Sequence, residues 1–324
     1  MSSSPVLEVQ HLAAGFDTEA GRIRAVEDVS FQVHRGKTLG IVGESGCGKS
    51  VTALSIMRLL PQPAGKILEG RILYQGSDIV CLSAEEMRTL RGCRMAMIFQ
   101  EPMTALNPVH RIGRQIGEVF QLHDRSLRED QIRHRSIDML ARVGIPDPDR
   151  RFDEYPHQIS GGMRQRVMIA IALAVRPDIL IADEPTTALD VTIQAQILDL
   201  MRQLQAENDM AMIFITHDLG VIADICDDVV VMYAGTVVES APVQSLFEKP
   251  KHPYTQGLLE SIPRLETPGK IPLPIIPGMV PSLDALPAGC RFHNRCSVAI
   301  PFCKTSLPSL TPVGHRHETR CHLV

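Results

Sequence analysis

The sequence predicts an α/β protein with a parallel-sheet core, and three local patterns support that prediction. Two short apolar runs, residues 179–182 and 211–215, are typical of central parallel strands, which are buried on both faces. A helix expected over residues 193–208 separates them and completes a βαβ unit. A third apolar run, residues 39–42, leads through a glycine-rich loop into a helix expected over residues 51–60.

The first third of the chain is expected to be rich in strands. Residues 6–10 and 29–33 alternate apolar and polar side chains, which is the period of a half-buried strand. We expect a further strand pair within residues 70–99, and its last part, residues 95–99, is a buried apolar run.

The later part of the chain carries a helical region and then a change of composition. Apolar residues recur at helical spacing between about residues 113 and 144. Residues 229–233, followed by Gly235, are typical of a hairpin. After about residue 249 prolines cluster and four cysteines follow, which indicates a linker leading into a small, loop-rich region.

Composition limits the class of protein. The 324 residues are 44% hydrophobic, enough for one large or two smaller domains with a sizeable core. The net charge of −4 and the 4% aromatic content favour no nucleic-acid partner. Because we find neither an apolar run near 18 residues nor a signal-peptide pattern, we expect a cytosolic protein. Its eight cysteines are then expected to be free thiols or metal ligands.

Residues 43–50 match the phosphate-binding pattern G-x-x-x-x-G-K-[ST]. The N–H groups of such a loop, and the positive end of the helix after it, attract phosphate oxygens. Lys49 is expected to reach the β- and γ-phosphates of a nucleotide, and the Ser50 hydroxyl to bind Mg²⁺. The candidate nucleotide-binding residues of this segment are Gly43, Glu44, Ser45, Gly46, Cys47, Gly48, Lys49, Ser50 and Val51.

Two carboxylates follow the apolar run at residues 179–182. A carboxylate at the end of a buried strand is costly unless a cation or hydrogen bonds compensate it. We therefore expect Asp183 to bind Mg²⁺ and Glu184 to act as the general base, or to position the water that attacks the γ-phosphate. The alternative interpretation is an ordinary helix cap.

Gln100 and His217 also follow expected strands. Ligands of open parallel sheets bind beyond the carboxyl ends of the strands, which is where both residues are expected. Gln100 is a candidate for orienting the water or completing the Mg²⁺ shell, and His217 for hydrogen-bonding the γ-phosphate. The alternatives are a solvated loop residue for Gln100 and a partly buried structural histidine for His217.

Residues 160–165 form a second candidate anion site, just before a helix expected at 167–175. Ser160 followed by two glycines at a helix start can bind an anion, although an ordinary N-cap is the alternative. One nucleotide rarely needs two phosphate clamps from the same chain.

The order of these motifs resembles the ATP-binding subunits of ABC transporters, over about residues 5–250. The resemblance implies the ABC ATPase fold of P-loop NTPases, with a parallel-sheet core, an antiparallel β subdomain and a helical subdomain at about residues 101–165. It assigns Walker A to 43–50, the Q-loop glutamine to Gln100, the signature to 160–165, Walker B to 179–184, the D-loop to 188–190 and the switch histidine to His217.

The resemblance also implies a head-to-tail dimer of ATPase subunits. Ser160 and Gly162 of one subunit would then clamp the γ-phosphate bound by the Walker A motif of the other. Phe16 is the candidate for the aromatic residue that stacks on adenine, with an edge-strand core phenylalanine as the alternative. Further nucleotide contacts are expected from Gly161, Gln165 and Asp190.

Shorter segments are similar to the dipeptide/oligopeptide permease branch of that family. They are residues 102–108, 155–158, 190–196 and 252–256, together with the cysteine-bearing tail. This resemblance implies a peripheral ATPase at the cytoplasmic face of the inner membrane. Its expected partners are a second, usually different, ATPase subunit, two integral membrane permease subunits contacted near residues 101–118, and a periplasmic or lipid-anchored peptide-binding protein. Importers of peptide antibiotics, glutathione, haem or nickel chelates, and a soluble ABC ATPase without a transport role, are the alternatives.

The last four cysteines form a candidate metal site in an expected C-terminal domain, residues 251–324. Four thiolates can hold Zn²⁺ or an iron–sulfur cluster. Zinc ribbons favour C-x2-C pairs, which are absent, so the wider spacing and the resemblance favour a structural [4Fe–4S] cluster. Mixed zinc ligation and the absence of any metal are the alternatives. The cysteines are Cys290, Cys296, Cys303 and Cys321, and the neighbouring histidines are His293, His315, His317 and His322.

Overall fold

The computed structural model describes residues 4–19, 21–100, 105–187, 189–262 and 274–324. The chain divides into two compact units. Unit 1 comprises Met1–Val33, Thr38–Val80 and Phe214–Val324, and unit 2 comprises His34–Lys37 and Cys81–Ile213. Pro102, Met103, Thr104 and Ala188 of the expected motifs lie outside the described residues.

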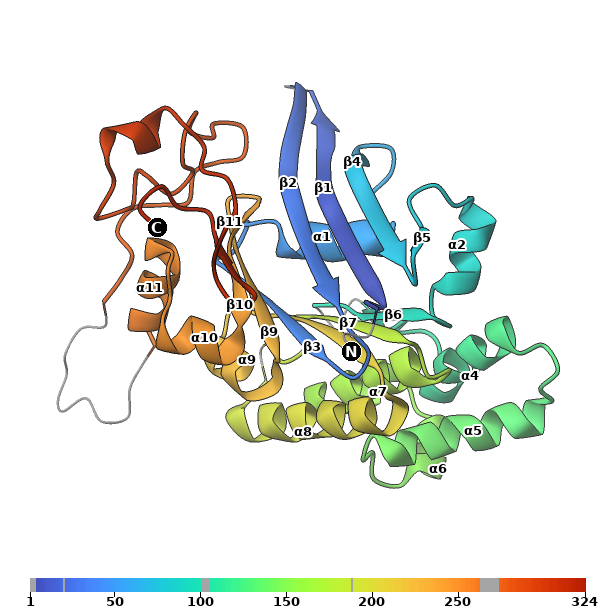
Figure 1. Ribbon diagram of the computed structural model, residues 1–324. Helices are drawn as coiled ribbons and strands as arrows, with labels where there is room; N and C mark the ends of the chain where they lie inside the picture. The colour runs from blue at the N-terminus through green and yellow to red at the C-terminus, as the bar shows by residue number, and fades with distance from the viewer. Residues whose placement is uncertain (1–3, 20, 101–104, 188, 263–273) are drawn as a thin grey trace. The chain divides into compact units, whose positions relative to one another are not determined.

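Unit 1 contains an antiparallel sheet with the strand order β2-β1-β4-β5, in which β1 lies between β2 and β4 (Figure 1). The apolar side chains of Leu7 and Val9 are buried, as the alternating pattern predicts, and Leu12 is buried beyond a register shift that the pattern does not predict. The strand pair expected within residues 70–99 is only partly present: β4 starts earlier, at Gly65, and pairs with the two-residue strand β5, whereas the apolar run at residues 95–98 pairs with a strand of the other sheet. The strands are β1 (Leu7–Thr18), β2 (Gly21–Val33), β4 (Gly65–Tyr74) and β5 (Ser77–Asp78).

A second group of strands in unit 1 supports the glycine-rich loop. β3 (Thr38–Val42) is buried throughout and pairs in parallel with β9 (Asp228–Tyr233). β9 forms the expected hairpin with β10 (Thr236–Pro242). Ala234 and Gly235 both have positive φ, 44° and 84°, as the tightest hairpin turns require. β3 leads through the loop into α1 (Lys49–Ile56).

The C-terminal region differs from the expected loop-rich appendage with little core of its own. The short strand β12 (His317–Thr319) pairs with β10, and β11 (Thr311–Gly314) pairs with β12. Phe292 packs against Tyr233 and Tyr254, with ring centroids 5.2 and 5.4 Å away, in one buried aromatic cluster. This region therefore shares the core of unit 1, which sequence patterns do not indicate because its partners lie far away along the chain.

The remaining helices of unit 1 follow β8 and β10. They are α9 (Leu219–Ile225), α10 (Val243–Glu248), α11 (Pro253–Glu260) and the 3-10 helix η2 (Pro301–Lys304).

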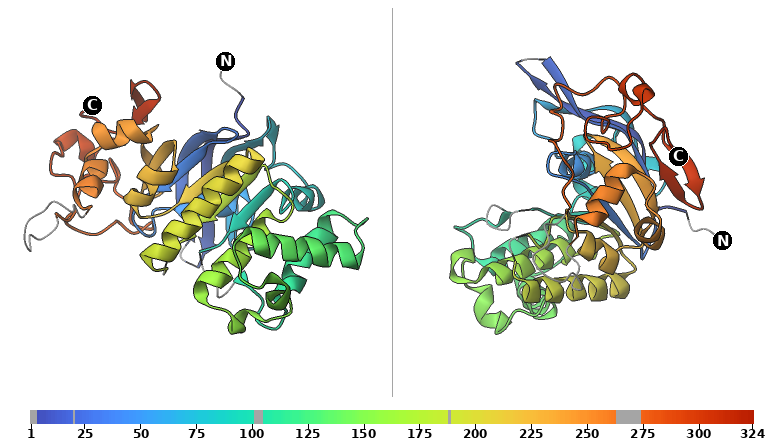
Figure 2. Two further views of the ribbon diagram at one scale, coloured as in Figure 1. Left: turned by 90° about the horizontal axis from the view of Figure 1, so that it is seen from below. Right: turned by 90° about the vertical axis from the view of Figure 1, so that its left-hand side faces the viewer.

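Unit 2 contains the predicted βαβ element. β6 (Met95–Ile98) pairs in parallel with β7 (Ile179–Asp183), and α8 (Val191–Asn208) leads from β7 into β8 (Ala211–Ile215), which begins in this unit. The helices α4, α5 and α6 contact one another and lie together in the green part of the chain (Figure 2). The other helices are α2 (Ala84–Leu90), α4 (Ile112–His123), α5 (Glu129–Arg142), α6 (Pro148–Phe152), η1 (Pro156–Gln158) and α7 (Gly161–Leu173).

The helical region of unit 2 is held by a narrow apolar stripe. Ile112, Ile116 and Phe120 follow one another at four-residue spacing on α4, and all three are buried. Gly113 lies so close to the Phe152 ring that a Cβ there would approach it to 2.3 Å. Within the described part of the chain, no helix combines the length and the apolar character needed to cross a membrane.

Candidate nucleotide-binding site

The loop between β3 and α1 has the backbone geometry of a phosphate cradle. Gly43 and Gly48 adopt φ angles of 152° and 102°, which residues other than glycine rarely adopt. A Cβ at Gly43 would lie 2.2 Å from the Met232 carbonyl oxygen, so the loop can pass β9 only at a glycine. Gly48 is the N-cap of α1, and the first turn of that helix holds no acidic residue. The positive helix end is therefore directed at the loop without an internal anion to neutralise it.

The Lys49 side chain folds back over this loop. It is only 6% exposed, and its Nζ donates to the carbonyl oxygens of Gly43, at 2.8 Å, and Glu44, at 3.0 Å. The Nζ also lies 3.8 Å from the Cys47 sulfur, and a buried ammonium with such neutral partners gains strongly from an approaching anion. Burial raises the pKa of the neighbouring Cys47 thiol, which is therefore protonated at neutral pH and can offer a ligand only its backbone.

Two residues of the C-terminal region, Tyr254 and Arg295, bond to Glu44, the second residue of the loop, and neither was among the predicted nucleotide contacts. The Glu44 N–H donates to the Tyr254 hydroxyl at 2.9 Å. The Glu44 carboxylate receives two bonds from Arg295, at 2.5 and 3.0 Å, and this pairing raises the pKa of Arg295. The guanidinium is 5% exposed, so it lies in a bidentate, largely desolvated ion pair.

In unit 2 the structure brings Gln100 and Glu184 together at the ends of the paired strands β6 and β7. The Gln100 Nε2 donates to the Glu184 Oε2 at 3.1 Å, and the Thr187 hydroxyl donates to the same oxygen at 2.9 Å. Glu184 has a φ of 47°, an uncommon conformation for a non-glycine residue that often marks functional sites. Asp183, the last residue of β7, is 4% exposed. Thr187 was not among the predicted residues, although it lies only three positions after Glu184.

The predicted signature segment begins α7. Ser160 is the N-cap, and its hydroxyl accepts a hydrogen bond from the Met163 N–H at 3.3 Å. The hydroxyl keeps its own proton for an outside acceptor, so capping and anion binding are compatible. A Cβ at Gly161 would meet no atom within 4 Å, which leaves the helix tip open, whereas Gln165 is buried. Asp190 is likewise an N-cap, of α8, and accepts from the Ile193 N–H.

Unit 1 contains the two other predicted nucleotide contacts. His217 is exposed directly after β8, and its neighbour Asp218 caps α9. Phe16 lies half-buried on β1, opposite Ile23 of β2. β1 lies between β2 and β4, so Phe16 does not lie on an edge strand.

The four C-terminal cysteines come within electrostatic reach of one another in unit 1. Burial raises the pKa of Cys290, Cys296 and Cys321, and the neighbouring sulfurs, including that of Cys303, raise it further. The sulfurs of Cys290, Cys296 and Cys321 each accept a hydrogen bond from the N–H group two residues later, which belongs to Phe292, Val298 and Leu323 respectively. Such amide donors stabilise thiolates that ligate a metal.

The present side-chain arrangement does not form a closed ligand set. Across the residues that the structure describes, no three His, Cys, Asp or Glu side chains converge closely enough to hold a metal ion. Three of the four neighbouring histidines have other contacts: His293 donates to the Cys290 carbonyl, His317 pairs with buried Glu239, and His322 contacts the Ser306 carbonyl. The four thiols could bind a metal together only if their sulfurs moved closer to one another.

Comparison with known proteins identifies the family. Residues 26–187 match the family model described as ABC transporter. The chain is an ABC-family ATPase. A second match, over residues 238–303 of the ATPase, is to the C-terminal region of oligopeptide/dipeptide transporters.

Full-length relatives of the ATPase agree with both matches. It is 50% identical to the dipeptide transport ATP-binding protein DppD of Bacillus subtilis, over 98% of this chain and 94% of that protein. It is 49% identical to the oligopeptide transport ATP-binding protein OppD of the same organism, over 98% and 89%. A peptide import ATP-binding protein of Brucella abortus is 52% identical, over 99% and 98%.

Solved structures support the fold of the ATPase. The dimeric ABC transporter cassette MJ0796 matches with a TM-score of 0.66 and 26% identity, over 73% of this chain and 98% of that chain. A post-hydrolysis dimer of MJ0796 with ADP and Pi matches with the same TM-score and 25% identity, over the same shares of the two chains. The expected ABC ATPase fold is thereby confirmed.

Proposed function

We propose that this protein is the ATP-hydrolysing subunit of an ABC importer for dipeptides and oligopeptides. The observation that carries the proposal is the match of residues 238–303 to the oligopeptide/dipeptide transporter C-terminal region, beside an ABC ATPase match at residues 26–187. The relatives DppD and OppD, which align over nearly the whole chain, support it. The protein acts peripherally, at the cytoplasmic face of the cell membrane.

Nucleotide binding begins at the loop of residues 43–50. The N–H groups of the loop and of the first turn of α1 receive the phosphate oxygens. Lys49 exchanges its carbonyl partners, Gly43 and Glu44, for the β- and γ-phosphates. Because the ammonium is already buried and positioned, little side-chain entropy is lost when the anion binds.

The residues present fit Mg²⁺. Carboxylate, hydroxyl and amide oxygens are the donors that this ion prefers, and Ser50, Asp183 and Gln100 supply them in the two units. When bound, the ion neutralises phosphate charge. Asp183 is buried at the end of β7, whereas Gln100 is exposed and bonds to Glu184.

Glu184 is the general base. Gln100 and Thr187 both donate to its Oε2 and so restrict the orientation of the carboxylate, which is the group proposed to accept a proton from the attacking water. Gln100 follows β6 and Thr187 follows β7, so the orientation of the Glu184 carboxylate depends on the positions of both segments. His217 is proposed to contact the γ-phosphate from unit 1.

A second ATPase subunit, expected to be a different chain, completes each site. Ser160 and Gly161 form an uncovered helix tip, followed by Gly162, that suits the γ-phosphate held by the loop of that subunit. The membrane permease subunits contact the helical part of unit 2, where a groove of about 880 Å³ is lined by Arg111, Arg114 and other residues of α4 to α6. A peptide-binding protein outside the membrane delivers the solute.

Reconstitution of the complete transporter tests this function. ATP hydrolysis in proteoliposomes is expected to rise when the binding protein is loaded with a dipeptide, and labelled dipeptide is expected to accumulate inside. Free amino acids serve as the control solute. ATP hydrolysis that is unaffected by loaded binding protein, with no peptide uptake, would contradict the assignment.

We propose further that Cys290, Cys296, Cys303 and Cys321 hold a structural [4Fe–4S] cluster, with Zn²⁺ as the alternative. The clustered sulfurs and the amide donors to three of them support a thiolate metal site. A bound metal supplies the positive charge that deprotonates buried thiols, and its binding energy stabilises the surrounding loops. The arginines next to three of these cysteines connect the site to β2 and to the phosphate loop: Arg291 bonds to Glu27, Arg295 to Glu44 and Arg320 to Asp28.

Anaerobic purification checks the cluster. We expect about four iron and four sulfide per chain, and visible absorption that Cys290→Ser abolishes, together with a lower midpoint of thermal unfolding. Cys81→Ser is the matched control, because Cys81 is exposed and distant in sequence from the site. Stoichiometric zinc without iron would replace the cluster by zinc, and a protein free of both metals would remove the site.

A further inference from the structure

Unit 1 contains a cavity of about 600 Å³ beside the phosphate loop. One wall is made by Phe16 and Ile23, which are directly opposed on β1 and β2, so their side chains leave the same face of the sheet. Ser45 and Gly46 of the loop line the cavity next to them. The facing wall is residues 280–284, which belong to the C-terminal region and not to the nucleotide-binding motifs.

The position and chemistry of this cavity suit a nucleoside. A triphosphate held at Ser45 and Gly46 extends its ribose and base away from the loop, and the volume lies within the range of small-molecule sites. Val280, Pro281 and Leu283 offer apolar surface opposite Phe16. Ser282 and Asp284 are hydrogen-bonded to each other, which lowers the pKa of Asp284 and keeps its carboxylate ionised. An ionised carboxylate is an acceptor for a ribose hydroxyl or an exocyclic amine.

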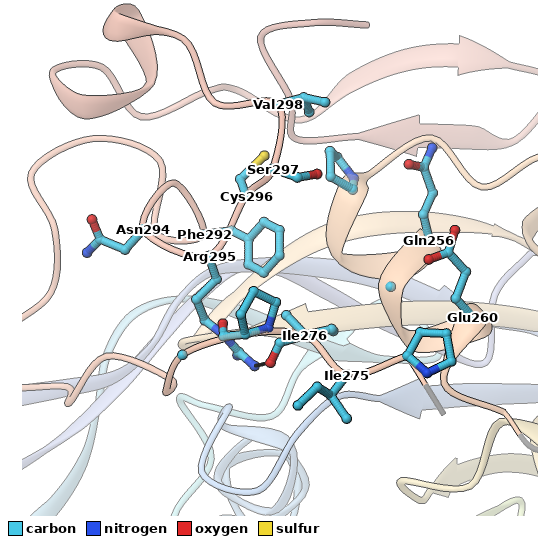
Figure 3. Close-up of a pocket in the computed structure, with 15 residues that line it drawn as sticks. Gln256, Glu260, Ile275, Ile276, Phe292, Asn294, Arg295, Cys296, Ser297 and Val298 are labelled. Atoms are coloured by element: carbon cyan, nitrogen blue, oxygen red, sulfur yellow. Dashed lines mark hydrogen bonds between the residues drawn. The ribbon is translucent and has the colours of Figure 1, made fainter. Parts of the chain in front are cut away.

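Arg295 fixes this wall relative to the loop. Besides its two bonds to Glu44, the guanidinium donates to the carbonyl oxygens of Pro277, at 3.0 Å, and Ile276, at 3.3 Å (Figure 3). Gly278 has a φ of 81°, and a Cβ there would lie 3.3 Å from the Arg295 side chain. The chain thus passes close over Arg295 before entering residues 280–284. One buried guanidinium holds both the phosphate loop and the approach to the facing wall.

We propose that residues 280–284 are part of the nucleotide-binding site, where they cover the ribose and base opposite Phe16, with Arg295 as the residue that positions them. The C-terminal region then contributes directly to nucleotide affinity. This proposal rests on the binding of ATP by the phosphate loop, as proposed above. The proposal can be tested separately from phosphate binding. Ligands that carry a nucleoside are expected to contact residues 280–284, and inorganic phosphates are not.

Calorimetry on the full chain with Mg²⁺ tests the wall, with ATP and inorganic tripolyphosphate as the two probes. Leu283→Ala removes apolar surface from a half-exposed position, so we expect the Kd for ATP to rise about five- to tenfold while the Kd for tripolyphosphate is unchanged. Met279→Ala is the matched control, because Met279 is 89% exposed and does not line the cavity. Equal ATP affinity in Leu283→Ala and the unaltered chain would overturn the proposal. Absence of ATP binding by the unaltered chain would instead overturn the proposed function.

A fluorescence measurement gives an independent test, because the chain contains no tryptophan. The variant Leu283→Trp carries a single indole in the wall. We expect Mg²⁺-ATP to change its emission and tripolyphosphate to leave it unchanged, since only the nucleoside reaches the wall. Met279→Trp is expected to respond to neither. An emission that ignores ATP under conditions in which calorimetry detects ATP binding would overturn the proposal.

Discussion

Replacing Glu184 by glutamine is expected to lower the rate of ATP hydrolysis by about 10²- to 10⁴-fold and to leave ATP binding intact. The glutamine amide has the shape of the carboxylate, so its oxygen can still accept the bonds from Gln100 and Thr187. It cannot accept a proton from water. The loss therefore falls on the chemical step and not on affinity.

The measurement is steady-state hydrolysis in the assembled transporter, together with ATP retention on the complex. We expect Glu184→Gln to retain uncleaved ATP and to hold the two ATPase subunits in a closed pair. Glu248→Gln is the matched control, since Glu248 is an exposed carboxylate on α10. Hydrolysis at the unaltered rate in Glu184→Gln would show that another group is the base.

The placement of Glu184 and Gln100 at strand ends was predicted from the sequence, whereas their direct contact was not, because it depends on the pairing of β6 with β7. Each residue follows a short apolar run, and parallel strands that are neighbours bring their carboxyl ends to one edge. The positive φ of Glu184 could not be predicted in this way. It depends on the turn after β7, in which a non-glycine residue adopts a conformation that local propensity disfavours.

The elements that were not predicted, or were placed wrongly, are those that hydrophobic periodicity does not indicate. α2 is short and polar, yet Ser83 and Glu86 form a capping box whose sequence pattern could have indicated the helix start. The strand β4 begins at Gly65, five residues before the expected pair, where its periodicity is weak. Both errors arise from reading apolar spacing without the end signals of the elements.

The role of the C-terminal region could not be predicted because its contacts are long-range. Arg295 and Glu44 are 251 positions apart, and no sequence pattern around either residue indicates that it pairs with the other. The proline-rich composition favoured an independent appendage, whereas Phe292 and β12 join the core and a strand edge of unit 1. Composition indicates what a segment can form alone, whereas the structure of the C-terminal region depends on its packing against the rest of unit 1.

Lys49→Ala is expected to act on binding, in contrast to Glu184→Gln. Removing a positively charged donor from the phosphates costs roughly 1.5–3 kcal/mol, which corresponds to a rise of about 10- to 150-fold in the Kd for ATP. In the alanine variant the carbonyl oxygens of Gly43 and Glu44 lose their ammonium partner. Their partial negative charge then repels the phosphate oxygens. The free chain is nevertheless expected to fold, because Glu44 retains Arg295 and Tyr254.

Calorimetry and thermal unfolding separate these effects. Without nucleotide, the unfolding midpoint of Lys49→Ala is expected to stay close to that of the unaltered chain. At the same Mg²⁺-ATP concentration, the increase produced by the ligand is expected to be smaller, since ligand stabilisation follows affinity. Tripolyphosphate should bind as weakly as ATP does, because the lost contact is to phosphate and not to the nucleoside. Lys249→Ala, at an exposed lysine after α10, is the matched control. Unchanged affinity for both ligands in Lys49→Ala would mean that the backbone of the loop alone binds the triphosphate, and that the buried ammonium serves only to hold the loop closed.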